Sequence, residues 1–424
     1  MEFTTTTDLP AAAAEAERPL WRNPDYLLLW LGQAVSILGS QASFLALPLL
    51  MLALTGSPVQ AGVLGGLRGV AYLCFGLPAG ALVDRWDRRR VMLLCDLGRA
   101  LALGSVPLAL LIGRLSAAQL YLVTFVEGTL FIFFGLAETA CLTRVTSSRQ
   151  LPTAVAQSQV TDAAATLIGP AFGGALYAAS RALPFVADAI SYGCSVLTVF
   201  CIRANLRPEL DPAAARRRLL PEITEGLRWC WGRPPLRFLL LYNTAINALY
   251  GGWPLLLIEL AKRQGAGAGT IGLIFAGGGA GTILGALSSR AVQRRFSVRA
   301  ITVVIAWIFA LTWPPYALAP NALALGTVNA VAFYFVPISG GTQFSYRLLV
   351  LPDQLQARVN SVFRLALFGG QTVGFVATGA LLERYGPAAT VWITLVPAVL
   401  LALYAGVDRS LAAAGRLGGD PHGS

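Results

Sequence analysis

Residues 80–90 read GALVDRWDRRR, and they run from the last residues of one long apolar segment, 59–83, to the start of the next, 91–112. The stretch holds two Asp and four Arg residues. An apolar helix of about 20 residues is long enough to cross the hydrocarbon core of a bilayer. The stretch therefore predicts a short charged turn at a membrane surface that joins two membrane-spanning helices.

The same alternation of apolar segments and short polar loops continues along the whole chain. Of the 424 residues, 56% are hydrophobic and 12% are charged, with a mean hydropathy of +0.64. An ordinary soluble domain has about 25% charged residues. We predict an all-α membrane protein with twelve transmembrane helices, near residues 26–54, 59–83, 91–112, 117–141, 154–179, 182–202, 238–261, 269–291, 301–318, 322–346, 359–382 and 388–407.

One long polar connection divides these segments into two sets of six. Leu151-Pro152 recurs as Leu351-Pro352, and Gly174-Ala-Leu recurs as Gly379-Ala-Leu, both about 200 residues later. Parallel repeats of this kind are a known transporter architecture. We therefore expect two pseudo-symmetric six-helix bundles, arranged as a flexible cytoplasmic tail (1–24), an N-terminal bundle (25–202), a cytoplasmic linker with a short amphipathic helix (203–237), a C-terminal bundle (238–407) and a second cytoplasmic tail (408–424).

The distribution of basic residues predicts the orientation. Loops on the side of the termini and the linker hold 24 Lys and Arg residues, and loops on the other side hold five. Cytoplasmic loops are enriched in Lys and Arg. We expect a multi-pass protein of the cytoplasmic (plasma) membrane with both termini in the cytoplasm. This placement also accounts for the net charge of +11, so no nucleic-acid partner is expected.

Residue types that support much of enzyme chemistry are scarce. The single His is His422, in a polar tail, and the six Cys residues form no CxxC pair. Most of these Cys lie in apolar segments, where Cys behaves as a small hydrophobic residue. We expect no metal, no cofactor and no enzymatic activity.

The charged stretch 80–90 can form bidentate ion pairs between neighbouring helix ends. The simpler alternative is a basic anchor at the membrane surface. The stretch resembles motif A of the major facilitator superfamily, Gly-x-x-x-Asp-Arg-x-x-Arg-Arg, and the resemblance implies the major facilitator fold. It also implies a cytoplasmic latch, the gate loop, formed by Gly80, Asp84, Arg85, Arg88 and Arg89. A related stretch in the second half begins at Gly285 and has Ser289 where the first half has Asp84. The latch is therefore expected to depend mainly on Asp84.

A second motif lies in the fifth span, where Gly169-Pro170-x-x-Gly173-Gly174 allows a partner helix to approach closely. Ordinary close packing is the alternative explanation. The segment resembles motif C of the same superfamily, which accompanies antiport and so implies export. We expect these glycines to pack across the two halves against a glycine ladder of the eighth span, Gly277, Gly281 and Gly285.

Three further segments are similar to the macrolide-efflux and enterobactin-exporter branch of this superfamily. They are residues 185–192, 222–228 and 356–361. The resemblance extends from Asn23 to Val407.

Charged residues within the spans are candidates for function, because each costs about 3 kcal/mol to insert. Glu127 lies near mid-membrane with no basic neighbour one turn away on its own helix, so it is the first candidate proton carrier, before Asp162 and Asp188. The remaining charges are expected to form an intramembrane network, for which simple pairing of Asp96 with Arg99 is the structural alternative: Arg68, Asp96, Arg99, Glu138 and Arg364.

Together these features predict a secondary active transporter that exports a small amphipathic organic molecule, such as a drug, a secondary metabolite or a siderophore. The expected mechanism is alternating access with proton antiport, by a monomer in the bilayer. Alternatives are an uptake symporter, a lipid transporter of the same fold, or a membrane sensor that does not transport. Polar and aromatic side chains expected in a central cavity include Gln33, Gln41, Tyr242, Asn243, Asn247, Trp253, Asn329 and Tyr334.

Overall fold

The computed structural model describes residues 19–206 and 219–412, and its regular elements are helices. Most of both predicted tails and residues 207–218 of the predicted linker lie outside the described residues. The first half contains η1 (Leu20–Arg22), α1 (Pro24–Thr55), α2 (Pro58–Phe75), α3 (Pro78–Val83), α4 (Arg88–Leu111), α5 (Ala117–Val145), α6 (Leu151–Ala179) and α7 (Leu183–Cys201). The second half contains α8 (Leu219–Trp231), α9 (Pro234–Tyr250), α10 (Trp253–Arg263), α11 (Ala268–Arg295), α12 (Val298–Leu311), α13 (Trp313–Leu318), α14 (Ala322–Val350) and α15 (Asp353–Val407).

These helices group into the twelve predicted spans, and the all-α membrane fold is confirmed. Three spans are broken in two, as α2 with α3, α9 with α10, and α12 with α13. Each second piece has a proline in its first turn (Pro78, Pro254, Pro314), where the missing N–H costs the helix nothing. Conversely, α15 holds two spans joined at Gly386, whose φ of 75° suits glycine. Eight helical segments of the described residues are long and apolar enough to cross a membrane.

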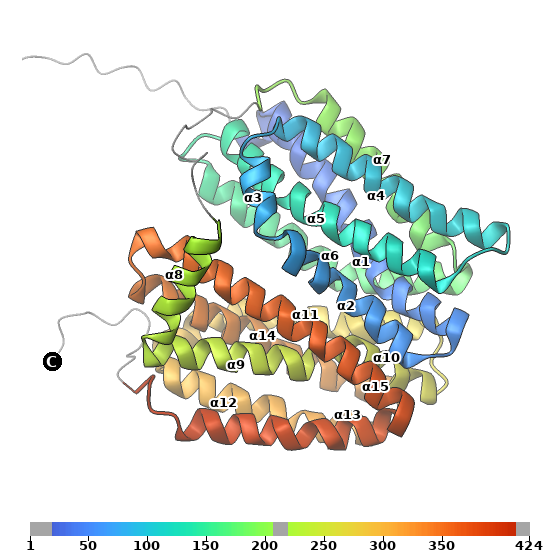
Figure 1. Cartoon of the computed structure of the whole chain (residues 1–424). Coiled ribbons are helices and arrows are strands. Elements are labelled where there is room, and N and C mark those ends of the chain that lie inside the picture. The colour runs from blue at the N-terminus through green and yellow to red at the C-terminus, as the bar shows by residue number, and fades with distance from the viewer. Residues whose placement is uncertain (1–18, 207–218, 413–424) are drawn as a thin grey trace, which may run out of the picture.

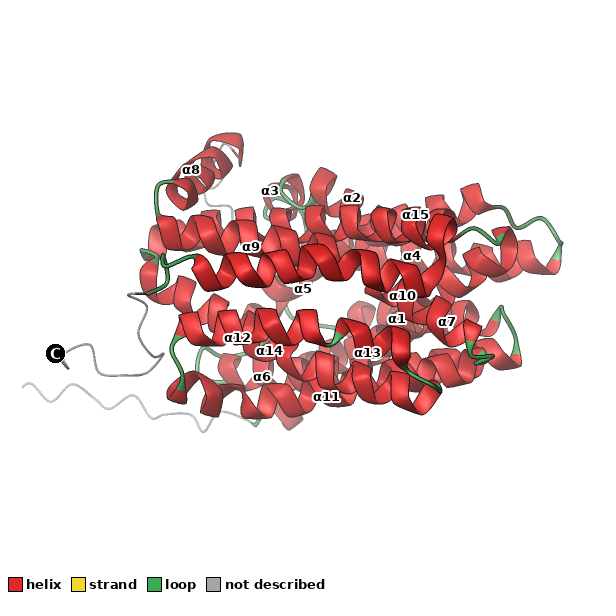
Figure 2. Ribbon diagram, turned by 90° about the horizontal axis from the view of Figure 1, so that it is seen from below, coloured by secondary structure: helices red, strands yellow, loops and turns green. Residues whose placement is uncertain are grey.

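The long helices run along one common direction, with α8 at one end (Figure 2). Within the first half, α1 packs on α6 and α7, and α4 packs on α5 and α7. Within the second half, α11 packs on α14, and α9 packs on α15. Two helix pairs make most of the contacts between the halves, α2 with α15 and α6 with α11 (Figure 1). The molecule is therefore two bundles held together along two antiparallel helix pairs.

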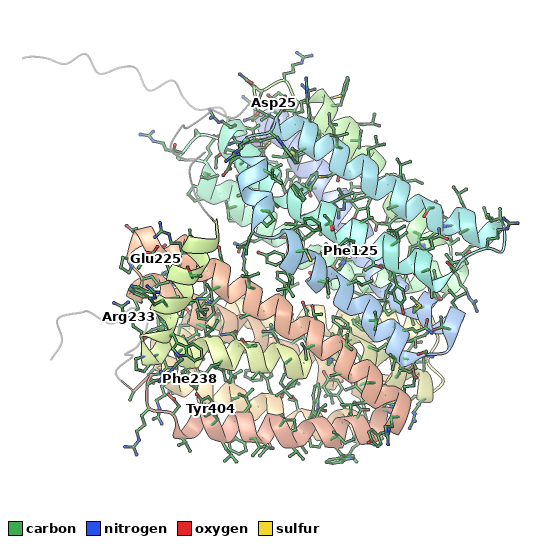
Figure 3. The ribbon with its side chains drawn as sticks, in the orientation of Figure 1. Asp25, Phe125, Glu225, Arg233, Phe238 and Tyr404 are labelled. Atoms are coloured by element: carbon green, nitrogen blue, oxygen red, sulfur yellow. The ribbon has the colours of Figure 1, made fainter. Side chains whose placement is uncertain are left out.

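The helix in the predicted linker is attached to the second bundle. Gly226 of α8 lies so close to α15 that a side chain there would meet the Arg358 carbonyl oxygen at 2.9 Å. Glu225, labelled in Figure 3, forms an ion pair with Arg358 at 2.6 Å. Segments 222–228 and 356–361, two of those that resemble the exporter branch, thus contact each other. We infer that α8 moves with the second bundle.

Contacts between the bundles end before one face of the molecule, which we call the linker side because it carries α3 and α8. From the opposite face inward, Gly62 of α2 packs on Phe375 and Gly379 of α15. The pairing continues to Tyr72, whose ring stacks on Phe368 with the centroids 4.0 Å apart. Beyond it, a side chain at Gly80 would meet no atom within 4 Å. The bundles diverge toward the linker side (Figure 1).

The expected pairing of the two glycine motifs is wrong in its partners. The ladder of the eighth span, Gly277, Gly281 and Gly285 of α11, packs on the backbone of α14 within its own bundle. Gly272 and Gly279 of α11 make the contacts with α6 instead. The glycines that contact α6 are seven residues apart and lie on a different face of α11 from the ladder, whose glycines are four residues apart. The spacing of glycines in the sequence does not say which face of a helix meets which neighbour.

Candidate functional site

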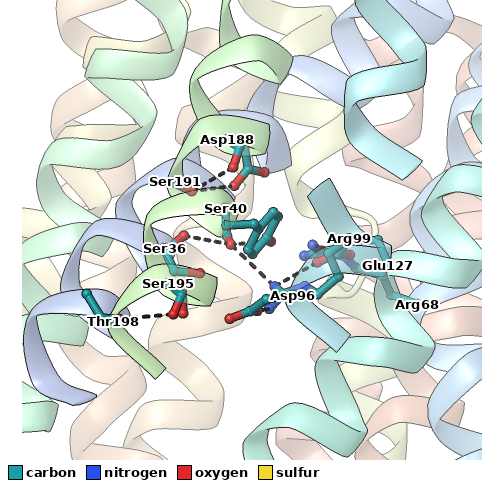
Figure 4. Close-up of polar contacts among 11 residues, drawn as sticks. Ser36, Ser40, Arg68, Asp96, Arg99, Glu127, Asp188, Ser191, Ser195 and Thr198 are labelled. Atoms are coloured by element: carbon teal, nitrogen blue, oxygen red, sulfur yellow. Dashed lines mark hydrogen bonds and ion pairs between the residues drawn. The ribbon is translucent and has the colours of Figure 1, made fainter. Parts of the chain in front are cut away.

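Four charged side chains from three helices of the first bundle form a network buried within the bundle (Figure 4). Arg68 of α2 donates from Nη2 and Nε to Oε2 of Glu127 on α5, at 2.6 and 2.9 Å. Arg99 of α4 donates from Nη2 to the other oxygen, Oε1, at 3.2 Å. Arg99 also pairs with Asp96, one helical turn away, with Nη1 and Oδ1 3.5 Å apart. Two guanidinium groups thus balance two carboxylates.

Arg99 extends the network to two more helices. Its guanidinium lies 4.0 Å from the ring centroid of Tyr192 on α7, and its Nη2 lies 3.5 Å from Oγ of Ser40 on α1. The Ser40 and Tyr192 hydroxyls are hydrogen-bonded to each other at 2.7 Å. Desolvated charges are stable only when they are paired and hydrogen-bonded. The network therefore fixes α1, α2, α4, α5 and α7 relative to one another.

Asp188 of α7 is buried near this network. Ser191 donates to its Oδ1 at 3.2 Å, and its Oδ2 has no hydrogen-bond partner among the described residues. No described cation forms an ion pair with Asp188. Asp188 is therefore a buried carboxylate beside the network with no ion-pair partner among the described residues.

The structure brings together only part of the predicted charged set. Arg68, Asp96 and Arg99 form the network, and Glu127, expected as a lone carboxylate, is its centre. The absence of a basic neighbour on α5 itself did not exclude cations from α2 and α4. Arg364 is exposed on α15, and no ion pair of Arg364 is found in the described chain. Glu138 and Asp162 line a separate cavity of the first bundle.

An apolar cavity lies between the two bundles, with an empty volume of about 490 Å³ including its open part. Its wall comes from α1, α2, α5, α10, α11 and α15, and includes Phe44, Leu64, Arg68, Ile258, Phe275 and Phe375. The Arg68 side chain is 32% exposed and is the one charged group in the lining. The buried network therefore reaches the cavity wall at one point.

None of the eight side chains expected in a central cavity lines this one. Asn329, for example, is fully buried in the second bundle, where it donates to the Ile274 carbonyl oxygen and accepts from the Tyr316 hydroxyl. The phenylalanines of the actual wall were missed. The sequence shows only that these phenylalanines lie in spans. Phenylalanines of the protein core also lie in spans, so this signal does not distinguish the two.

The gate loop is held by its own bundle. Asp87 caps α4 by accepting from the backbone N–H groups of Arg89 and Arg90. Arg89 donates to the Phe200 carbonyl oxygen at the end of α7 and lies over the Phe200 ring. Asp84 is exposed, and its side chain makes no hydrogen bond or ion pair within the described residues. The loop is thus fixed on one bundle, with Asp84 open to solvent.

The fifth-span motif faces two ways. A side chain at Gly173 would meet the backbone of Ala42 on α1 at 2.6 Å, and one at Gly169 would meet Gln41 of the same helix. Gly174 instead faces Gly272 of α11, across the two bundles. Pro170 is accommodated inside α6 without a break.

A contact at the face opposite the linker side was not predicted. The carboxylate of Glu383, in the connection between the last two spans, accepts from the Ser57 hydroxyl and from the Val59 backbone N–H at 3.1 Å. Ser57 is the N-cap of α2, so a carboxylate of the second bundle is held at a helix start of the first. The far-side contact, as we call it, closes the face opposite the linker side. The sequence signal for this contact was the position of Glu383 directly after the apolar span 359–382.

The comparison with known families agrees with this architecture. Residues 29–366 match the family model described as Major Facilitator Superfamily. The chain belongs to this superfamily. It is thus a multi-pass membrane transporter of the class that acts on small molecules.

Three relatives within the superfamily carry the names of export proteins. The chain is 27% identical over 393 residues to multidrug efflux pump Tap of Mycolicibacterium fortuitum, covering 91% of this chain and 95% of Tap. It is 24% identical over 375 residues to enterobactin exporter EntS of Shigella flexneri, covering 87% of each. Macrolide efflux protein A of Streptococcus pyogenes is 26% identical over 230 residues, covering 53% of this chain and 56% of that protein. The predicted resemblance to this branch is confirmed.

A solved structure shows the same fold. A bacterial homologue of the human lysosomal transporter Spinster, in an inward-facing and unoccupied conformation, superposes with a TM-score of 0.73. The match covers 95% of this chain and all of the homologue at 15% identity.

Proposed function

We propose that this major facilitator protein exports a small amphipathic organic molecule, such as a drug, a secondary metabolite or a siderophore, in exchange for protons. The observation that carries the proposal is the apolar cavity between the bundles, with Arg68 of the buried network in its wall. Concave, mostly apolar sites with few polar groups suit ligands of this kind. The export relatives Tap and EntS support the direction of transport.

The orientation follows from the charge asymmetry of the loops. The linker side, rich in Arg, faces the cytoplasm, and both termini lie there, at the plasma membrane. Because the bundles diverge on that side and the far-side contact closes the other, the conformation is inward-facing. A single chain builds the whole cavity, so we propose that the transporter works as a monomer.

The gate loop acts in the opposite conformation. When the linker side closes, α3 and α4 approach α11 and α15 of the second bundle. Asp84, which is exposed in the inward-facing conformation, then forms the ion pair or hydrogen bond that holds the closed side. This assigns the latch to Asp84 and its loop, Gly80 to Arg89.

The candidates for the proton carrier are still Glu127, Asp162 and Asp188. Their environments in the structure favour a different first candidate from Glu127, which the sequence favoured. Glu127 is neutralised by two arginines, so releasing it requires the network to rearrange. Asp188 is buried with one free carboxylate oxygen and no cation of its own. We propose Asp188 as the first candidate to take up and release the proton.

Transport and its direction are tested in a bacterial host that lacks its main efflux pumps. We expect the protein to raise the minimum inhibitory concentration of at least one amphipathic antibiotic in a panel that includes macrolides and siderophore conjugates. In proteoliposomes, the same compound should move against its gradient when a pH gradient is imposed. Lowered resistance with increased accumulation would show uptake instead, and no change for any compound would contradict the proposal.

A further inference from the structure

The first bundle contains a second cavity, lined by α1, α5 and α6 and separate from the one between the bundles. Its empty volume is about 450 Å³, including its open part. Its lining includes Tyr26, Trp30, Gln33, Glu138 and Asp162. We propose that this cavity is a binding site for an organic cation that carries an aromatic group and a hydrogen-bond acceptor. The inference rests on the proposed export function, and it names a substrate class.

Two carboxylates give the cavity its charge. Glu138 of α5 and Asp162 of α6 both line the cavity. Neither forms an ion pair with a cation within the described part of the chain, and Arg99 is already paired with Asp96 and Glu127. Like charges that share a partly buried site are stabilised by a cation placed between them. The site thus lacks one positive group.

The polar atoms of the aromatic side chains are already used elsewhere. Trp30 donates from Nε1 to Oγ1 of Thr161 at 3.1 Å, and the Tyr26 hydroxyl donates to Gln157. Both bonds go to α6 and fix the orientation of the rings. Aromatic faces attract organic cations within about 6 Å of the ring centroid. Trp30, which is partly exposed, can therefore contribute ring surface to a bound cation, whereas Tyr26 is fully buried behind it.

An unpartnered amide gives an independent indication of a ligand. Gln33 is 9% exposed, lines the cavity, and its Nε2 has no hydrogen-bond partner among the described residues. Buried amide groups are nearly always hydrogen-bonded, and leaving one unpaired is costly. An ester, ether or hydroxyl oxygen of the ligand would satisfy it.

A bare metal ion fits the cavity less well. No group of three or more His, Cys, Asp or Glu residues in the described chain could hold one. Calcium takes six to eight oxygen ligands, whereas this cavity offers two carboxylates beside two aromatic rings. The mixture of ring surface and carboxylate favours an organic cation.

The test uses a matched pair of dyes with the full-length protein in nanodiscs of neutral phosphatidylcholine. Tetramethylrhodamine methyl ester is a cation, and its free acid is a zwitterion with the same ring system. Fluorescence anisotropy should show the ester binding about tenfold more tightly than the acid. The double variant Glu138→Gln, Asp162→Asn should lose at least about tenfold in affinity for the ester.

Three further variants separate charge from folding. The single variant Asp162→Glu keeps both negative charges of the cavity. It should bind the ester as the native protein does, unlike the double variant. Gln33→Leu keeps both charges and should weaken ester binding roughly fivefold through the lost hydrogen bond. Glu259→Gln, in a surface pair with Lys262 on α10, should bind as the native protein does. Each variant is checked by gel filtration and thermal unfolding before the titration.

Equal affinity for the ester in the double variant, or equal affinity of the native protein for ester and acid, would overturn the site. These outcomes are distinct from a failure of the export proposal. Resistance conferred to neutral compounds without cation binding would retain export and remove this site. Cation binding that depends on Glu138 and Asp162, without any transport, would retain the site and remove export.

Discussion

Glu127 is the residue on which the charges of the first bundle depend, because it is the common partner of Arg68 and Arg99. Removing one member of a buried ion pair leaves an uncompensated charge, which costs about 3–5 kcal/mol. Asp188, by contrast, bonds to Ser191 and to no described cation. The two carboxylates should therefore respond differently to neutralisation.

We expect Glu127→Gln to lower the thermal unfolding temperature markedly and to abolish transport, since two arginines then share one remaining carboxylate. Thermal unfolding in detergent measures the first effect. Glu259→Gln is the matched control, because a surface pair contributes about 0–1 kcal/mol. A Glu127→Gln protein with native stability and native pH-driven transport would show that the network is not required.

Asp188→Asn should keep the hydrogen bond from Ser191 and hence the stability of the fold. If Asp188 carries the proton, this variant should still bind substrate but lose accumulation driven by a pH gradient in proteoliposomes. Counterflow exchange, which needs no proton gradient, should persist and serves as the control. Loss of counterflow as well would point to a structural role for Asp188.

At the scale of helices, the two bundles touch through small residues, so that helix backbones approach closely. Gly174 of α6 faces Gly272 of α11, and Gly62 of α2 faces Gly379 of α15. Small residues at helix crossings allow this approach in membranes. These crossings hold together the conformation in which the bundles diverge on the linker side.

Gly272→Leu should therefore block the close approach of α6 and α11. A side chain there would begin 2.3 Å from the Pro170 carbonyl oxygen, so the helices must separate. We expect a loss of stability of at least about 1–3 kcal/mol and loss of transport. Gly269→Leu, on the same helix but with no atom within 4 Å, is the control and should behave as the native protein. Transport by Gly272→Leu at the native rate would contradict the role of this crossing.

The far-side contact predicts a specific pH dependence. Hydrogen bonds from Ser57 and Val59 hold the pKa of the Glu383 carboxyl below its usual value. A lowered pKa means that the contact stabilises the closed face fully above the usual Glu pKa of about 4.3 and is lost as pH falls through the lowered value. The conformational equilibrium should therefore not change through this group between about pH 5 and 8.

Spin labels on the ends of α4 and α13, at Leu111→Cys and Leu318→Cys in a background without native cysteines, can measure this equilibrium. We expect the Glu383 contact to add no change in this distance from neutral to mildly acidic pH and to lengthen it only in strong acid. Glu383→Gln should lengthen it at neutral pH. A transition near neutral pH that Glu383→Gln removes would contradict the lowered pKa.

Over the whole molecule, the bundles behave as two bodies that meet at one face and diverge at the other. The linker helix α8 is bound to α15, and the gate loop is bound to α7, so each body carries its own surface elements. Alternating access by rocking of two repeats requires this division. In the proposed latch, Asp84 joins the two bodies when the linker side closes.

Asp84→Asn should leave the inward-facing conformation intact, since Asp84 makes no side-chain bond to other described residues there. It should reduce the outward-facing population by about tenfold, the usual size of a coupling between states. Spin labels at Arg90→Cys and Arg290→Cys, on the linker-side ends of α4 and α11, report the closed distance. An unchanged population of that distance would remove Asp84 from the latch.

The sequence was sufficient for the spans and the superfamily, because length, hydropathy and loop charge depend on each segment alone. It was insufficient wherever the answer depended on which helix faces which. Depth along α5 located Glu127 in the membrane, but its arginines come from α2 and α4. Spacing located the glycine ladder, but Gly281 packs on α14 and Gly272 meets α6. The contact of Glu383 with Ser57 depends on the register of α2 against α15, which no local pattern encodes.

The buried network also has a consequence for the insertion of the protein into the membrane during synthesis. Its four charges enter the membrane in chain order, with Arg68 and Arg99 synthesised before Glu127. Arg99 has Asp96 on its own span, but Arg68 has no carboxylate until Glu127 is made, and an unpaired arginine in hydrocarbon costs about 3 kcal/mol. We therefore expect the second span to leave the insertion channel together with the fourth, so that the first four spans enter the bilayer as one assembly unit.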